Sequence, residues 1–155
     1  MKGILMNALE KLLVVLVGVI TIDVIWQVAS RYIFNNPSSF TDELAGFLLI
    51  WLGLFGAAYV TGRDEHLAID ILPQKLEGKQ KRRLQILIYG LVIIFALAVM
   101  VVGGINLVYL TFLLEQKSAS LQVPLGFVYI SIPLSGILIC YFSLESILNL
   151  QPAKA

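Results

Sequence analysis

Charged side chains are scarce in this sequence. They make up 14% of its 155 residues, whereas about a quarter of the residues are charged in an ordinary soluble domain. Basic and acidic residues nearly balance, and the formal net charge is +1. A nucleic-acid-binding domain carries a basic excess on one face, so we expect no nucleic-acid partner.

Cysteine and histidine are almost absent as well, and Cys140 and His66 are the single residues of each kind. One thiol cannot close an intramolecular disulfide, and the sequence offers no cluster of ligands for zinc. It also contains no glycine-rich phosphate loop and no nucleophile elbow. We therefore expect no metal site, no cofactor and no catalytic residue, and predict that the protein is not an enzyme.

Hydrophobic residues dominate what is present. They make up 59% of the chain, more than a soluble chain of this length can bury. They gather in four continuous segments that each reach the roughly 20 residues a helix needs to cross a bilayer, without the alternation of barrel strands. The sequence predicts an all-α membrane protein in a single domain, residues 1–155, with transmembrane helices at about 9–34, 44–62, 84–114 and 123–150.

The longest polar linker, residues 63–83, separates the second and third segments. Its middle, residues 67–73, is apolar but too short to cross a membrane, so we interpret it as an interfacial stretch. His66 and Asp70 are four residues apart and could share a helix face, but no third group accompanies them to form a catalytic site. The residues predicted to anchor this linker are Arg63, His66, Asp70 and Pro73.

Lysine and arginine are distributed unevenly over the two sides of the predicted helices. Nine of the eleven lie in the amino-terminal segment, the linker 63–83 and the carboxyl-terminal tail, while Arg31 and Lys117 lie on the other side. Positive residues stay on the cytoplasmic side of membrane proteins. We therefore expect both termini and the long linker to be cytoplasmic.

A polar stripe runs along the outer half of the first segment. Asp23, Gln27 and Arg31 are spaced four residues apart, so on a helix they lie within an arc of about 80°. A carboxylate inside a membrane normally faces protein or a water-filled cavity. The stripe is either a proton- or cation-linked site or a polar seam that joins this helix to a neighbour or partner subunit, and the seam is the simpler interpretation.

A short polar turn separates the first two segments. Asn35 and Pro37 have turn chemistry, and the acidic pair Asp42 and Glu43 complements the positive end of the second helix dipole. Arg31 is placed to meet one of these carboxylates. We predict that this turn holds the first two helices in register.

Other residues of the apolar segments suggest helix packing. Gly53 and Ala57 are four residues apart, and small residues at this spacing let helix backbones approach closely. Trp51 lies too deep in its segment for an interfacial aromatic belt, which favours a packing role. Pro133 lies inside the fourth segment, where it should kink the helix or leave a carbonyl without its usual donor.

A distinctive order of residues begins at the end of the first segment. It reads RYIFNNPSSFTDEL over residues 31–44 and continues with Trp51, Gly56-Ala57, Arg63, His66, Asp70 and Leu72-Pro73. This order resembles the signature of the small permease subunits, DctQ type, of tripartite ATP-independent periplasmic (TRAP) transporters. The chain departs from that pattern at Phe40, where tryptophan is usual, and at Asp42, where glutamate is common.

The resemblance implies a scaffold subunit in a bacterial inner membrane. Such a subunit pairs with a large permease subunit, DctM type, which carries the substrate and sodium sites. A soluble periplasmic binding protein delivers the substrate, typically an organic acid such as a C4-dicarboxylate or a sialic acid. Apart from these partners, only membrane lipids are expected to surround the chain.

Two other functions remain open from the residues alone. One is a self-contained, homodimeric, proton-coupled exporter that uses Asp23, and the other is a membrane enzyme that uses His66 and Asp70. On the favoured reading, the candidate residues for partner contact or helix packing are Asp23, Gln27, Arg31, Tyr32, Asn35, Pro37, Asp42, Glu43, Trp51, Gly53 and Ala57.

Overall fold

The computed structural model of the chain describes residues 2–33, 39–63 and 78–149. Its helices are α1 (Lys2–Tyr32), α2 (Ser39–Gly62), α4 (Gly78–Phe95), the π-helix η2 (Ala96–Gly103), α5 (Gly104–Leu113), α6 (Leu125–Tyr129) and α7 (Ser131–Asn149). Four stretches are long and apolar enough to cross a membrane, namely Lys2–Tyr32, Ser39–Gly62, Gln80–Leu113 and Leu125–Asn149. The predicted all-α membrane fold with four transmembrane helices is confirmed. Most of the predicted charged linker, including His66, Asp70 and Pro73, lies outside the described residues.

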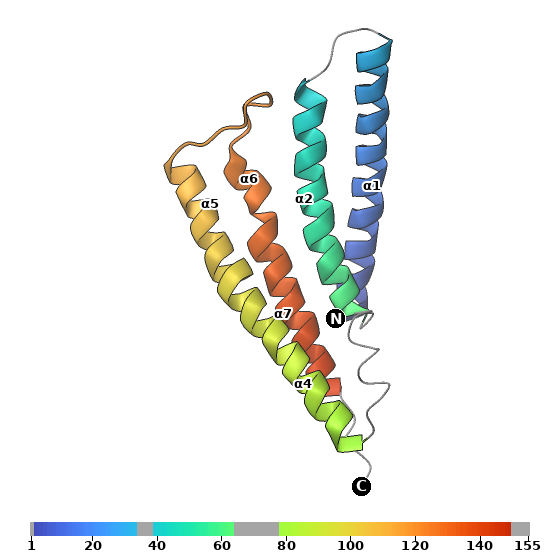
Figure 1. The fold of residues 1–155 in the computed structure, drawn as a ribbon, viewed down its shortest axis with the longest axis vertical. Helices are drawn as coiled ribbons and strands as arrows, with labels where there is room; N and C mark the ends of the chain where they lie inside the picture. Colours follow the sequence, from blue (N-terminus) through green and yellow to red (C-terminus); the bar gives the residue numbers. More distant parts are fainter. Residues whose placement is uncertain (1, 34–38, 64–77, 150–155) are drawn as a thin grey trace.

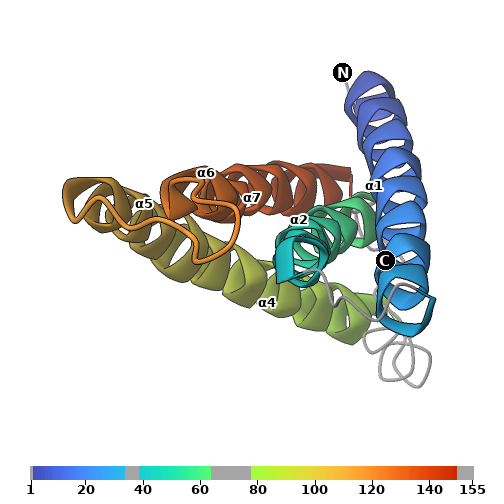
Figure 2. The same ribbon diagram turned by 90° about the horizontal axis from the view of Figure 1, so that it is seen from above.

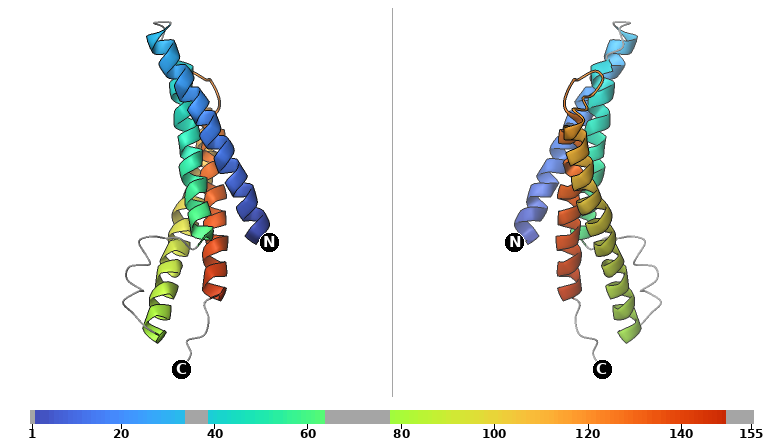
Figure 3. Two further views of the ribbon diagram at one scale, coloured as in Figure 1. Left: turned by 90° about the vertical axis from the view of Figure 1, so that its right-hand side faces the viewer. Right: turned by 90° about the vertical axis from the view of Figure 1, so that its left-hand side faces the viewer.

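The helices form two antiparallel pairs. Figure 1 shows α1 beside α2, and the long stretch from α4 to α5 running antiparallel to α6 and α7. Helix α7 connects the pairs, because it contacts α2 as well as α4 and η2. Seen from above, α1 lies next to α2 and apart from α5 (Figure 2), and it crosses α2 at an angle (Figure 3). The start of α1 and the end of α7 lie at one end of the bundle, and the α5–α6 loop (residues 114–124) lies at the other (Figure 1).

A narrow stripe of α1 packs inside the bundle. The buried residues of this helix are Leu9, Leu16, Asp23 and Ser30, each seven positions after the last. Seven residues turn an α-helix by almost two full turns, so these side chains lie on one line. The remaining apolar residues of α1 are largely exposed, as suits a helix that faces lipid on most of its circumference.

Two small apolar clusters join the helices. Leu9, Phe55 and Phe142 bring together α1, α2 and α7, while Ala58, Ala96 and Ile139 bring together α2, η2 and α7. Helix α7 contributes to both clusters, which explains why it is the central helix.

Two irregularities interrupt the long helices. Helix α6 ends at Tyr129 and α7 begins at Ser131, because Pro133 has no N–H to donate to the carbonyl of Tyr129. The predicted effect of Pro133 is therefore confirmed. The π-helix η2 covers eight residues in the middle of the third membrane-crossing stretch. No residue pattern predicted it, since π geometry is rare and has no simple sequence signature.

Candidate functional site

A carboxylate near the start of α2 organises the end of the bundle that carries the α5–α6 loop. Glu43 accepts hydrogen bonds from three consecutive backbone amides of that loop. Its Oε1 lies 3.0 Å from the amide nitrogen of Ala119, and its Oε2 lies 2.8 Å from that of Ser120 and 2.9 Å from that of Leu121. The arrangement places one negative charge where three N–H dipoles converge, which is a charge-assisted network.

The α5–α6 loop has a defined fold of its own. The amide of Ser118 donates to the carbonyl of Val123 at 2.9 Å, and Lys117 and Pro124 form an isolated antiparallel bridge. Glu115 and Gln122 take positive φ angles of 47° and 54°, a conformation that reverses the chain direction. The loop is therefore a compact turn clamped from outside by Glu43.

The structure assigns Glu43 a different partner from the one predicted. Within the described residues, Arg31 forms no ion pair with Asp42 or Glu43 and is exposed. The Glu43 carboxylate is occupied by amides that follow it by 76 to 78 positions in the sequence, and local patterns cannot reveal contacts of that range. Tyr32 and Asp42 are exposed at the same end of the bundle, while Asn35 and Pro37 lie outside the described residues.

Trp51 connects α2 to α6 deeper in the bundle. Its indole Nε1 donates to the carbonyl of Val128 at 3.0 Å, and its ring lies 5.7 Å from that of Phe55, centroid to centroid. The Val128 carbonyl also accepts from the hydroxyl of Ser131 at 2.8 Å. Such a donor needs a partner away from water, and this half-buried tryptophan finds one on α6. No residue pattern marks Val128 as its acceptor.

The three residues of the predicted polar stripe on α1 differ in how far they are buried. Asp23 is 7% exposed and lies on the stripe that packs inside the bundle, while Gln27 is half-buried and Arg31 is exposed. Ser30, which the sequence analysis did not single out, shares the buried line with Asp23. Oδ2 of Asp23 has no hydrogen-bond partner among the described residues. The carboxylate therefore lies between helices rather than along an open path.

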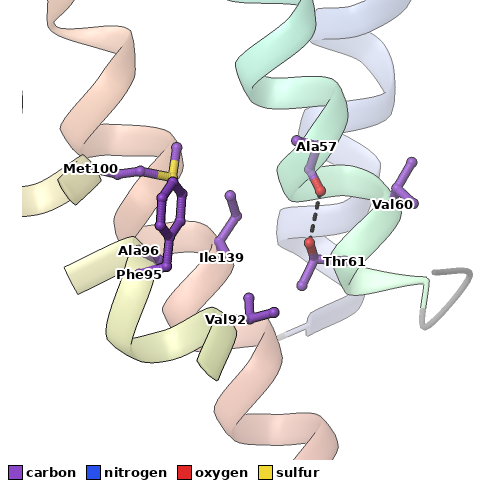
Figure 4. A pocket seen from close by; sticks show the side chains of 8 residues that line it. All are labelled: Ala57, Val60, Thr61, Val92, Phe95, Ala96, Met100 and Ile139. Atoms are coloured by element: carbon purple, nitrogen blue, oxygen red, sulfur yellow. Dashed lines mark hydrogen bonds between the residues drawn. The ribbon is translucent and has the colours of Figure 1, made fainter. Parts of the chain in front are cut away.

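An apolar groove runs between α2 and the third membrane-crossing stretch. One part has a volume of about 510 Å³, and Figure 4 shows the side chains that line it, namely Ala57, Val60, Thr61, Val92, Phe95, Ala96, Met100 and Ile139. A second part of about 530 Å³ is lined by Leu49, Ile50, Gly53, Leu54, Phe95, Val99, Met100, Tyr129 and Ile132. The Thr61 hydroxyl donates to the Ala57 carbonyl of its own helix at 2.8 Å (Figure 4). The groove thus offers almost no free polar group to a solute.

Gly53 and Ala57 lie on this groove instead of in a helix contact. A Cβ atom built at Gly53 would meet nothing within 4 Å, and Ala57 is exposed. The close approaches in this chain occur at other glycines. A Cβ at Gly136 would lie 2.7 Å from Cβ of Met100, and one at Gly104 would lie 3.0 Å from Cδ of Pro133. The four-residue spacing of small residues therefore does not reveal which of them face another helix of the same chain.

Within the described ranges, no group of three histidine, cysteine, aspartate or glutamate side chains is placed to hold a metal ion. Arg63, the one described member of the predicted linker anchors, is exposed, and its guanidinium carbon lies 5.5 Å from the centre of the Tyr59 ring. That distance is compatible with a cation–π contact.

Comparison with known proteins agrees with this architecture. The family model described as tripartite ATP-independent periplasmic transporters, DctQ component, matches residues 20–152. The sialic acid TRAP transporter small permease protein SiaQ of Vibrio cholerae serotype O1 is 27% identical over 97% of this chain and 86% of its own length. The C4-dicarboxylate TRAP transporter small permease protein DctQ of Rhodobacter capsulatus is 30% identical over 67% of this chain and 45% of its own length.

A longer relative also matches. The sialic acid TRAP transporter permease protein SiaT of Haemophilus influenzae is 29% identical over 44% of this chain, and the match covers 12% of its own length. The resemblance read from residues 31–73 is confirmed by the family model, which extends over both ends of that stretch. The chain is a multi-pass membrane protein that belongs to the small permease subunits, DctQ component, of the tripartite ATP-independent periplasmic transporters.

Proposed function

We propose that this chain is a single integral membrane domain that acts as the non-catalytic scaffold of a sodium-coupled uptake system. In this proposal a large permease subunit moves the substrate, and a soluble periplasmic protein delivers it. The observation that carries the proposal is the apolar groove between α2 and the third membrane-crossing stretch. A solute path needs several polar groups that converge near the midplane, and the groove contributes mainly aliphatic and aromatic side chains.

The match to the longer relative supports the large partner. The matched part is 12% of SiaT, so in that protein a segment similar to this chain is joined to a much longer remainder. A permanent partner of that size would cover apolar surface that this chain leaves open, including the groove that contains Gly53 and Ala57.

We propose an organic acid as the substrate class. The names of the relatives specify a sialic acid for the Vibrio protein and a C4-dicarboxylate for the Rhodobacter protein. Both ligands carry carboxylates, so uptake against a negative membrane potential would need a coupled cation, for which sodium is the proposed ion. The buried Asp23 is a helix-packing residue in this proposal and takes no part in proton transfer.

We further propose a bacterial inner-membrane location with both termini in the cytoplasm, which the lysine and arginine distribution supports. Single cysteines at Ser120 and Gln80, introduced in a Cys140→Ala background, are expected to label from opposite sides. Both native positions are exposed. A membrane-impermeant maleimide should modify Ser120→Cys in intact spheroplasts and Gln80→Cys only after the membrane is opened. Labelling of Gln80→Cys in intact spheroplasts would contradict this topology.

Reconstitution tests the proposed function directly. In liposomes, uptake of labelled substrate is expected only when this chain, the large permease subunit, the loaded binding protein and an inward sodium gradient are all present. Each omission should reduce uptake to the level of empty liposomes. Substrate movement by this chain alone, driven by a proton gradient and abolished in Asp23→Asn, would refute the scaffold function and favour the homodimeric exporter.

A further inference from the structure

We propose that Glu43 is a positioning residue that holds the α5–α6 loop in the shape to which the soluble substrate-binding protein docks. This inference rests on the proposed function, because it needs a soluble partner on that side of the membrane. It names the surface used by that partner and the side chain that keeps the surface in order.

The contact between Glu43 and the loop has a geometry that sets the shape of the backbone. Three successive amides of the loop, those of Ala119, Ser120 and Leu121, point at one carboxylate at distances of 2.8 to 3.0 Å. Both oxygens of Glu43 are used. Three neighbouring amides can meet one carboxylate only if the backbone curves around it, so the contact fixes the curvature of this part of the loop.

This contact, the Glu43 clamp, is not required to join the helices. Trp51 already joins α2 to α6 through its hydrogen bond to the carbonyl of Val128. Trp51 follows Glu43 by eight residues, which is about 12 Å along the helix axis. A loop between two neighbouring helices can also satisfy its amides with water. The additional effect of Glu43 is therefore on the shape of the loop rather than on the association of the helices.

The clamped loop presents polar side chains to the solvent. Lys117, Ser120 and Gln122 are exposed, and the side-chain amide of Gln122 is itself held by the carbonyl of Ala119 at 2.9 Å. Glu115, at the start of the loop, is exposed as well. The loop therefore presents one charge of each sign among uncharged polar groups, and its ammonium group suits a partner surface that places a carboxylate opposite Lys117. Opposite charges at such a rim steer association, and a loop that is already ordered loses little entropy on binding.

The position of the loop at one end of the bundle favours a soluble partner over a transmembrane one. The loop lies at the end of the bundle opposite the start of α1 and the end of α7 (Figure 1), which is the extracytoplasmic end in the proposed topology. Its exposed polar groups stand beyond the last apolar turn of α5. A binding protein that diffuses on that side reaches this surface without entering the membrane, whereas a transmembrane partner would need an apolar face.

Glu43→Gln in the complete reconstituted transporter tests this inference. Glutamine keeps the shape of the side chain but removes its negative charge. Its amide nitrogen is a hydrogen-bond donor, so it cannot accept a bond from the loop amides. The initial rate of substrate uptake is measured against the concentration of loaded binding protein. We expect the concentration for half-maximal rate to rise about tenfold, since the loss of a charge-assisted contact corresponds to roughly that factor, while the maximal rate changes less than twofold.

Two further variants make the test specific. Asp42→Asn removes the same charge from the neighbouring residue, which is exposed, and is expected to leave the half-maximal concentration unchanged. Lys117→Glu leaves the clamp intact and should raise that concentration by a factor similar to Glu43→Gln. Should Glu43→Gln fail to assemble with the large subunit, the clamp would be required for assembly of the bundle, and the inference would be overturned whatever the result for Lys117→Glu.

The outcomes separate this inference from the proposed function. Uptake by the native transporter without any binding protein would refute the proposed function. Normal dependence on the binding protein, together with an unchanged half-maximal concentration in Glu43→Gln and Lys117→Glu, would overturn only the docking role. A fall in maximal rate at an unchanged half-maximal concentration would assign Glu43 to bundle stability and would overturn the inference as well.

Discussion

Gly136→Ala is expected to lower the free energy of unfolding of the detergent-solubilised chain by about 1–3 kcal/mol, the usual range for overpacking a tight contact. The added Cβ would lie 2.7 Å from Cβ of Met100 and 3.2 Å from Cγ2 of Val101. A Cβ atom is fixed to its backbone and cannot rotate away, so α7 and η2 would have to separate. The thermal unfolding midpoint measures the loss, and a lower yield of complex with the large subunit should accompany it.

Gly103→Ala provides the matched control on the facing element. A Cβ at Gly103 would meet only the carbonyl oxygen of Ala98, at 3.8 Å, which is an ordinary contact. Replacing an unhindered helical glycine by alanine favours the helix by about 0.5–1 kcal/mol. The two substitutions should therefore shift the unfolding midpoint in opposite directions. An increase in both would show that α7 and η2 are farther apart than the structure has them.

The four-helix fold follows from the apolar segments, because their length and continuity leave few alternatives for a backbone in lipid. The interruption before Pro133 also follows from one residue, since proline lacks the N–H that an unbroken helix needs. The eight-residue π-helix η2 does not follow in this way. Its residues are alanine, leucine, methionine, valine and glycine, which are common in any membrane helix, and it packs against α7.

The polar stripe shows where helical periodicity stops being informative. A spacing of four correctly groups Asp23, Gln27 and Arg31 on one side of α1, but each step of four drifts by about 40°. The buried line of α1 instead follows a spacing of seven, which drifts by only about 20° per step in the opposite sense. Asp23 and Ser30 therefore enter the seam together, and Arg31 does not.

The contacts of Glu43 could not be predicted, for a different reason. The sequence placed this carboxylate at the start of a helix, where the helix dipole favours a negative charge, and the nearest visible cation was Arg31. Its actual donors are backbone amides of the α5–α6 loop. Every residue except proline has such a donor, so no residue type in that loop marks it as the partner.

Trp51→Ala is expected to be the second strongly disruptive substitution. Trp51 is only half-buried, so the loss in free energy of unfolding should fall near 3 kcal/mol, at the lower end of the range for removing a buried tryptophan ring. The variant loses the ring contact with Phe55, which lies on the same helix, and the hydrogen bond to Val128, which attaches α2 to α6. Trp26→Ala is the control, because Trp26 is 57% exposed and less ring surface is lost from the interior.

Trp51→Phe separates the ring from its hydrogen bond. Phenylalanine keeps most of the packing and removes only the indole donor, while the Val128 carbonyl keeps its bond from the Ser131 hydroxyl. Because no acceptor is left without a partner, the loss should stay near 1 kcal/mol, the net contribution of an ordinary hydrogen bond. If Trp51→Phe were as damaging as Trp51→Ala, the indole–carbonyl bond would be the main attachment of α2 to α6. If both variants unfolded like the native chain, the contact would be too weak to hold the two helix pairs together, and the joint would depend on the clusters around Phe142 and Ile139 alone.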